Sequence, residues 1–455
     1  MEKLPGEVLD LIIGELSDSW EQCDLYGARL VCQTWNQFAI RLLFSTVTFY
    51  TNDESMSNDF RSWNRLMDLQ SVKNTVQRVI IQTCPRRSHQ HEVWKLWEER
   101  GQWPAFRSAI NRIAELGNLT ALEIHFNPPW GEGPSARRFA MEAVYQALKQ
   151  REERASRDGS VKLVSIQELR LENLQNIDPP DALGNGLLKG IKRLHLNILG
   201  NRLIRYTSYG DISASDYRVT ERLKFDDILR NKILVPVMNQ LVELNISSHY
   251  EWGLLPSRFN GNGLMFPNLR TLILSDFYIG HYDQLDWVFD QKTLTCLRLQ
   301  HCHVVTHFRF QFHNHLVWNV DINDWATFDG EPWFAGESGS NFFSFNLRWN
   351  TIFDNIRESL PNLTDFGTTW RIERDPCADA YSVPSMYNMT GRYMVFDDES
   401  VPGGFTTYFG DPRENDKINS ESPWSQELFS YEKDASALHS LLQTVHDRRR
   451  RVRYF

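Results

Sequence analysis

The stretch LTCLRLQHCHV, residues 294–304, decides the fold of this chain. Leu297 and Leu299 alternate with polar residues, which is the period of a strand with one buried face. Leu294, Cys302 and Val304 continue the apolar pattern on either side of that strand. The unit apolar-x-x-apolar-x-apolar recurs along much of the chain, so an internal repeat has to be identified before any local interpretation.

Copies of this unit define the repeat region. The clear copies begin at Ile166, Ile191, Leu241, Leu269 and Leu294, weaker ones begin at Val76, Leu119 and Val317, and Leu363 with Phe366 forms a last, degenerate copy. From 166 to 191, and again from 269 to 294, the interval is 25 residues, within the range of leucine-rich repeats. We therefore predict an α/β fold in which each repeat contributes a short strand and buries its apolar side against its neighbours.

The repeat is irregular. The position that Cys302 holds is Asn127 in one copy and Leu174, Leu199, His249, Phe277 and Trp325 in others. Most of the buried asparagine ladder of regular repeats is therefore missing. Inserts interrupt the pattern at 135–157, where the spacing predicts an amphipathic helix ending in solvent, at 202–226, and at the aromatic-rich residues 325–349. We expect an irregular leucine-rich-repeat solenoid over residues 70–430, closed by a helix with a basic tail at 431–455.

Two N-terminal stretches, LPGEVLDLIIGEL at 4–16 and DLYGARLVCQTWNQFAIRLLF at 24–44, have the apolar spacing of short helices. Pro5 suits the first turn of a helix, where its missing N–H costs nothing, and Asp24 can cap the next helix. The first stretch predicts one helix and the second predicts two. Three helices of this size have too little interior to bury all of their apolar surface. We therefore expect residues 1–48 to leave an apolar face for a partner.

The same residues resemble the F-box family. The match comprises Leu4-Pro5, Glu7, Leu9, Ile12 and Leu16, then Asp24-Leu25, then Arg29-Leu30-Val31-Cys32 and Trp35. The resemblance implies a three-helix motif that docks onto a Skp-type adaptor and, through it, onto a cullin. An ordinary N-terminal helical cap on the repeat domain is the alternative interpretation.

The exposed apolar stripe predicts which residues contact the adaptor. They are Leu4, Pro5, Val8, Leu9, Ile12, Leu25, Leu30 and Val31, and Trp35 is expected to support the helices from behind. Such a contact would be disrupted by charges placed in it, because they would be buried without partners.

Substrate recognition is expected on the outward face of the repeat strands. Side chains alternate along a strand, so the residues between and just after its inward apolar positions must point outward. The substrate-binding residues expected from this rule are Arg170, His195, Asn245, Arg298 and Asp321. Any solvated strand face also shows polar residues, so plain surface is the alternative. If the strand positions are not aligned, the substrate site moves to the aromatic insert around Trp325, Trp333 and Phe343.

No sequence pattern predicts catalysis, a metal site or a cofactor. His301, Cys302, His303 and His307 are metal-ligand types, but the repeat assigns Cys302 to a buried position and no second pair follows at zinc-finger spacing. The glycines at 184, 186 and 190 miss the dinucleotide fingerprint by one residue and follow a turn. A hidden enzyme would need a cleft with convergent titratable groups.

Composition indicates an intracellular globular protein. The chain has 455 residues, no long apolar run, and six cysteines without paired short spacing, so we expect reduced thiols, no membrane segment and a cytoplasmic or nuclear location. The formal charge of -9 argues against nucleic-acid binding. The run Arg448 to Arg451 is either a nuclear-import signal, a contact for an acidic partner, or a solvated tail that complements a helix C-terminus.

The sequence thus predicts the substrate-recognition subunit of a Skp, cullin and F-box ubiquitin ligase, without catalytic chemistry of its own. It would bind the adaptor through its N-terminus and a protein substrate through its repeats. The alternative is a leucine-rich-repeat interaction scaffold with no role in ubiquitin transfer.

Overall fold

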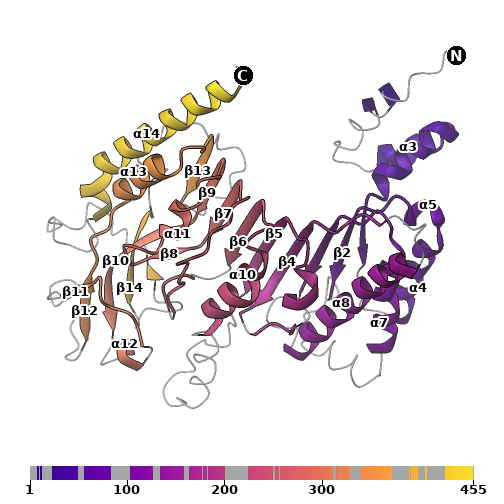
Figure 1. Ribbon diagram of the computed structural model, residues 1–455, viewed down its shortest axis with the longest axis horizontal. Coiled ribbons are helices and arrows are strands. Elements are labelled where there is room, and N and C mark those ends of the chain that lie inside the picture. Colours follow the sequence, from indigo (N-terminus) through magenta and orange to yellow (C-terminus); the bar gives the residue numbers. More distant parts are fainter. Residues whose placement is uncertain are drawn as a thin grey trace. The chain divides into compact units, whose positions relative to one another are not determined.

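The computed structural model describes residues 8–9, 11–12, 23–49, 56–83, 103–126, 134–157, 163–176, 178–181, 183–199, 224–248, 252–255, 257–310, 314–317, 319–327, 340–370, 389, 391–397, 405–406 and 426–453. The chain forms two compact units, whose helices and strands are labelled in Figure 1. Unit 1 comprises Met1–Leu174 and Pro179–Ile191, and unit 2 comprises Gln175–Asp178 and Lys192–Phe455. The division falls inside the repeat region, and the expected limits near residues 48, 70 and 430 stay predictions.

Unit 1 contains a parallel sheet built from repeat copies. Its strands, in spatial order, are β1 (Thr46–Phe49), β2 (Arg78–Gln82), β3 (Ala121–His125) and β4 (Glu168–Gln175). The copies predicted at residues 76, 119 and 166 each lead into one of these strands, because their alternating apolar residues fill one face. β1 carries no copy of the repeat and was not predicted, although its neighbour β2 was.

The helices of unit 1 return the chain between strands. They are α4 (Met56–Asp68), α5 (Gln70–Lys73), α7 (Trp103–Asn111), the 3-10 turn η1 (Arg112–Glu115), α8 (Pro134–Arg157) and the π turn η2 (Leu183–Leu187). α8 confirms the helix predicted over 135–157. Its charged end is not wholly in solvent: Arg151 is buried and its guanidinium donates to the carbonyls of Leu116, Gly117 and Val164, each at 2.8 Å. A buried arginine requires such acceptors, and this one ties the loops beside α8 together.

Unit 2 contains a second run of parallel strands. In spatial order they are β5 (Arg193–Leu199), β6 (Glu243–Ser248), β7 (Thr271–Ser275), β9 (Cys296–Gln300) and β13 (Asp365–Thr369). The degenerate copy at Leu363 and Phe366 is thus a real strand. The copy predicted at Val317 is wrong, since that segment forms the short helix α12 (Asn314–Val317) and a turn. A brief apolar run has the same composition in a helix and in a strand, and tertiary packing decides between them.

The chain turns sharply at the same place in three repeat copies. Asn173, Asp276 and His301 have positive φ angles of 59°, 58° and 51°, and they occupy equivalent positions in the copies that begin at 166, 269 and 294. Asn and Asp tolerate this left-handed conformation better than most residues, and all three side chains are unbranched at Cβ. Asp276 and His301 directly follow β7 and β9, whereas Asn173 lies within β4, two residues before its end.

A smaller sheet in unit 2 was not predicted. It consists of β8 (Tyr278–Ile279), β10 (His303–Phe310), β11 (Ala326–Thr327), β12 (Asn341–Ser344), β14 (Tyr393–Asp397) and β15 (Phe405–Thr406). β10 is buried along its whole length and pairs with β8, β12 and β14. Trp325 stacks on Phe308 with ring centroids 3.7 Å apart. Trp325 and Phe343 of the aromatic insert therefore belong to the core of this sheet.

The remaining helical elements of unit 2 are η3 (Leu229–Leu234), α10 (Val235–Val237), α11 (Asp286–Phe289), α13 (Trp349–Ser359) and α14 (Gln426–Arg453). α14 lies alongside α13 (Figure 1) and buries Ala437, Leu438, Leu441 and Val445, as their helical spacing predicts. Within the described residues, no helix combines the length and apolar character needed to cross a membrane.

Candidate interaction surfaces

The N-terminal helices form a small core of their own. In the described part of this region, α2 (Cys23–Ala28) and α3 (Gln33–Leu43) bury Leu25, Ala28 and Ala39, with Trp35, Phe38, Leu42 and Leu43 packed against them. Trp35 thus packs inside, as expected of a residue that supports the helices. Leu4 and Pro5 lie outside the described residues.

The turn between α2 and α3 presents apolar side chains to solvent. Leu30 is 87% exposed and Val31 is 61% exposed, and Val8, Leu11, Ile12 and Tyr26 are also exposed. We call Tyr26, Leu30 and Val31, which lie on α2 and on the turn that follows it, the N-terminal apolar surface. Leu9 and Leu25 are only 5% and 3% exposed, so both side chains are packed within the chain. Their expected role as contact residues stays a prediction.

This turn is held in place by polar contacts. The N–H of Leu30 donates to the Gly27 carbonyl at 3.0 Å, and Arg29 Nε donates to Asn36 Oδ1 at 3.1 Å. The exposed side chains therefore sit on a defined backbone. Burying Leu30 and Val31 in a complex would contribute about 2 to 4 kcal/mol from the hydrophobic effect.

The outward strand face of unit 1 is a network of opposite charges. Arg78 on β2 bonds both Glu123 on β3 and Glu168 on β4, the latter at 2.8 Å, and His125 Nε2 lies 3.1 Å from Glu123 Oε2. The hydrogen bond from His125, together with Arg78, outweighs desolvation and lowers the pKa of Glu123 to about 2. Arg170 lies directly beside Glu123 in register and pairs with Glu172 at 2.5 Å.

The outward strand face of unit 2 has a row of aligned side chains. The register places His195, Asn245, Ile273, Arg298 and Gly367 next to one another on β5, β6, β7, β9 and β13. Arg298 reaches Asp365 at 2.5 Å, and His195 lies 3.3 Å from Glu243. A Cβ at Gly367 would lie 2.1 Å from Arg298 Nη1, so the glycine makes room for the guanidinium to cross β13.

Four of the five expected substrate residues lie on these strand faces, and one does not. Arg170 is on the face of unit 1, and His195, Asn245 and Arg298 are on that of unit 2. The expected place of Asp321 on a strand face is wrong, because its segment is not a strand. Its carboxylate pairs instead with Arg258 at 2.6 Å. Both arginines are engaged in partly exposed ion pairs, which cost about 0 to 1 kcal/mol to exchange for a partner's carboxylate.

The alternative aromatic site is not an open surface. Trp325 and Phe343 are buried in the smaller sheet, and Trp333 lies outside the described residues. For Trp325 and Phe343, packing in the hydrophobic core explains the aromatic side chains.

The histidines of β10 are packed into the fold. Burial lowers the pKa of His303 to about 4 and that of His307 to about 3, and His303 Nδ1 lies 2.5 Å from the Gly391 carbonyl. Burial also raises the pKa of the Cys302 thiol, whose Sγ lies 3.4 Å from the Leu274 carbonyl. No group of three or more potential metal ligands occurs among the described residues.

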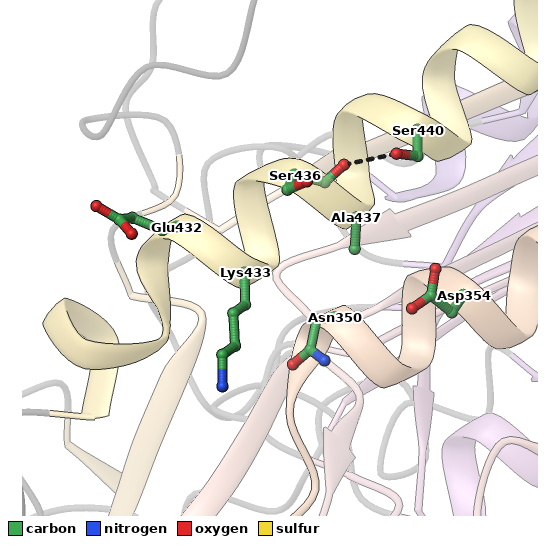
Figure 2. Close-up of a pocket in the computed structure, with 7 residues that line it drawn as sticks. All are labelled: Asn350, Asp354, Glu432, Lys433, Ser436, Ala437 and Ser440. Atoms are coloured by element: carbon green, nitrogen blue, oxygen red, sulfur yellow. Dashed lines mark hydrogen bonds between the residues drawn. The ribbon is translucent and has the colours of Figure 1, made fainter.

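A hollow of about 370 Å³ lies between α13 and α14 (Figure 2). It is lined by Asn350, Asp354, Glu432, Lys433, Ser436, Ala437 and Ser440. The hydroxyl of Ser440 donates to the carbonyl of Ser436 at 2.9 Å, so it is used within the helix. Lys433, Glu432 and Asp354 do not converge on one point in Figure 2, and the hollow offers no arrangement of nucleophile and base.

Comparisons with known proteins add little. No family model matches the sequence, and no curated protein matches it. Among solved structures, an internalin from Listeria monocytogenes is similar over 58% of this chain and 58% of its own length, at 12% identity and a TM-score of 0.22. The chain thus spans less than two thirds of that protein, and a TM-score this low carries no argument.

Proposed function

We propose that this protein is a binding subunit that joins two protein partners and has no catalytic chemistry of its own. The observation that carries the proposal is the N-terminal apolar surface, in which Leu30 and Val31 are exposed on a turn fixed by Arg29. Exposed apolar residues gathered over a small helical core are typical of a protein interface. The second partner would bind the polar strand faces.

More specifically, we propose that the N-terminal partner is a Skp-type adaptor. The support is the resemblance of residues 4–35 to the F-box motif, together with the exposure of its Leu30-Val31 pair. The adaptor would link the chain to a cullin, and other subunits would transfer ubiquitin to the protein held by the repeats. The proposal includes no metal, cofactor, nucleic acid or membrane, and places the complex in the cytoplasm or nucleus.

The experiment is co-purification of adaptor and cullin with the full chain and with Leu30→Asp/Val31→Asp. Charges at these positions would be buried unpaired in the interface, so adaptor recovery should fall at least about tenfold. Both side chains are exposed, so the variant should fold normally. Leu69→Asp/Leu316→Asp is the matched control, because it places the same charges at exposed leucines outside the N-terminal helices.

Recovery of adaptor with the double variant at the unaltered level would reject the F-box proposal. Recovery of the adaptor without any cullin would favour the second candidate, an interaction scaffold outside ubiquitin transfer. The structure makes this scaffold a real competitor, since the N-terminal apolar surface is open to any helix with a complementary apolar face.

A further inference from the structure

The C-terminal part of α14 is hydrogen-bonded to the end of α13. Arg448 donates to the carbonyls of Leu360 at 2.7 Å and Arg357 at 2.9 Å, which ties this part of α14 to the end of α13. The helix continues to Arg453, so the arginines after Arg448 stand on an anchored helix (Figure 1). Arg450 and Arg451 are both exposed.

Helix dipoles do not balance the positive charge at this place. α13 and α14 both end here, and each end carries about half a negative charge. Among the described residues nearby, Lys292 and Arg448 satisfy carbonyls at the end of α13, and Arg357 pairs with Asp354 and Glu358. Arg448 to Arg451 carry four positive charges. The carboxylate of Asp447 and the two half charges of the helix ends offset about two of them, so about two positive charges remain on the last turns of α14.

The positively charged guanidinium groups at this end of α14 repel one another. Burial lowers the pKa of the Arg448 guanidinium, and the positive charge of Arg451 lowers it further. Within the described residues, Arg450 and Arg451 have no carboxylate partner to offset this repulsion. A cationic cluster of this kind stands out in a chain whose formal charge is -9, because the overall field does not attract anions to it.

We propose that the exposed arginines on the last turns of α14, Arg450 and Arg451 above all, bind an acidic segment of a partner protein. Guanidinium groups form bidentate contacts with carboxylates, and those on a fixed helix lose less freedom on binding than those on a flexible tail. The site shares no residue with either surface of the proposed function and does not depend on that function.

The size and charge of the surface favour a protein over a nucleic acid. Nucleic-acid affinity grows with the number of phosphates neutralised, and a useful footprint needs many cations spread along the backbone. Among the described residues of this surface, the cations without a carboxylate partner are Arg450 and Arg451, which lie within one helical turn. The strand faces in both units mix carboxylates with arginines. A short acidic stretch matches this extent.

The test is fluorescence anisotropy of a labelled oligoglutamate peptide titrated with the full chain at low ionic strength. The variant is Arg450→Glu/Arg451→Glu. The matched control, Arg138→Glu/Lys149→Glu, makes the same change in net charge at two exposed positions on α8. Peptide affinity should fall at least about tenfold in the variant and less than about twofold in the control.

Equal losses in the two variants would overturn the proposal, since the peptide would then sense only net charge. Unchanged affinity in the Arg450/Arg451 variant would also overturn it. Tighter, Arg450- and Arg451-dependent binding of a single-stranded oligonucleotide of equal charge would replace the protein partner with a nucleic acid. Adaptor co-purification should be unaffected in every variant.

Discussion

Asp434 and Arg448, both on α14, hold opposite ends of α13. Asp434 Oδ1 accepts the N–H of Asn350 at 2.9 Å in the first turn of α13, and Arg448 donates to the carbonyls of Arg357 and Leu360 at its end. The two helices therefore run in the same direction. The acid lies at the positive end of the α13 dipole and the base at its negative end, so both contacts stabilise the pair electrostatically.

Asp434 also completes a buried ion pair, which gives a stability prediction. It accepts from Arg392 Nε at 2.9 Å and from the Tyr393 hydroxyl at 2.8 Å, and both Arg392 and Asp434 are buried. Asp434→Asn keeps the shape but removes the buried negative charge that faces Arg392, so it should lower the free energy of unfolding by about 3 to 5 kcal/mol. Urea unfolding measures this. Asp447→Asn, at an exposed position on the same helix, should change stability by less than about 0.5 kcal/mol; similar values for the two variants would contradict the prediction.

Buried histidines predict a loss of stability in mild acid. His303 and His307 have native pKa values lowered to about 4 and about 3, while unfolded histidine titrates near 6.5. The unfolded chain therefore binds more protons below about pH 6.5, and each histidine lowers the free energy of unfolding by about 1.4 kcal/mol per pH unit. The two together should remove about 4 kcal/mol between pH 7 and pH 5.

The pH effect is measured by urea unfolding across that range. His303→Gln/His307→Gln should flatten the dependence, because glutamine does not titrate, whereas His446→Gln at an exposed position should leave it unchanged. Glu123, with its pKa lowered to about 2, loses its contribution only below about pH 4.5, so it does not mask the histidines. Burial also lowers the pKa of His281, so a smaller slope should remain after the double substitution. A slope as steep as that of the unaltered chain would rule out His303 and His307 as the cause.

The left-handed backbone at Asp276, directly after β7, predicts that a glycine there is more stable than a β-branched residue. Its φ angle of 58° suits Gly and is strained for a β-branched residue. Asp276→Val should therefore be about 1 to 3 kcal/mol less stable than Asp276→Gly. The comparison of two variants removes the lost carboxylate from the result. Equal melting temperatures would mean that the backbone there can relax.

The polar strand faces predict reduced substrate capture without loss of the adaptor. Arg170→Ala/Arg298→Ala removes one arginine from each strand face, and their ion pairs with Glu172 and Asp365 are exchangeable. Capture of bound proteins, measured by mass spectrometry while degradation is blocked, should fall several-fold, roughly 1 kcal/mol. Arg138→Ala/Arg270→Ala removes two exposed arginines on α8 and just before β7, and should leave capture intact. An unaltered set of bound proteins would exclude these arginines from recognition.

Local sequence determined the repeat strands and the long helices. The apolar alternation around Leu297 and Leu299 predicts β9, and the same pattern finds the strands begun by copies at 76, 119, 166, 191, 241 and 269. Helical spacing likewise predicts α8 and α14. These patterns suffice because one-sided burial imposes a period of two on strands and of 3.6 on helices.

Tertiary structure decided the conformation and burial of segments that the apolar pattern alone leaves ambiguous. It made a helix of the copy at Val317, placed Asp321 against Arg258, and turned part of the aromatic insert into the core of a second sheet. It also separated the exposed Leu30 from the buried Leu25, which the sequence treats as equivalent apolar residues. Burial depends on neighbours distant in the chain, so a local pattern can say that a side chain is apolar, and only the fold can say what covers it.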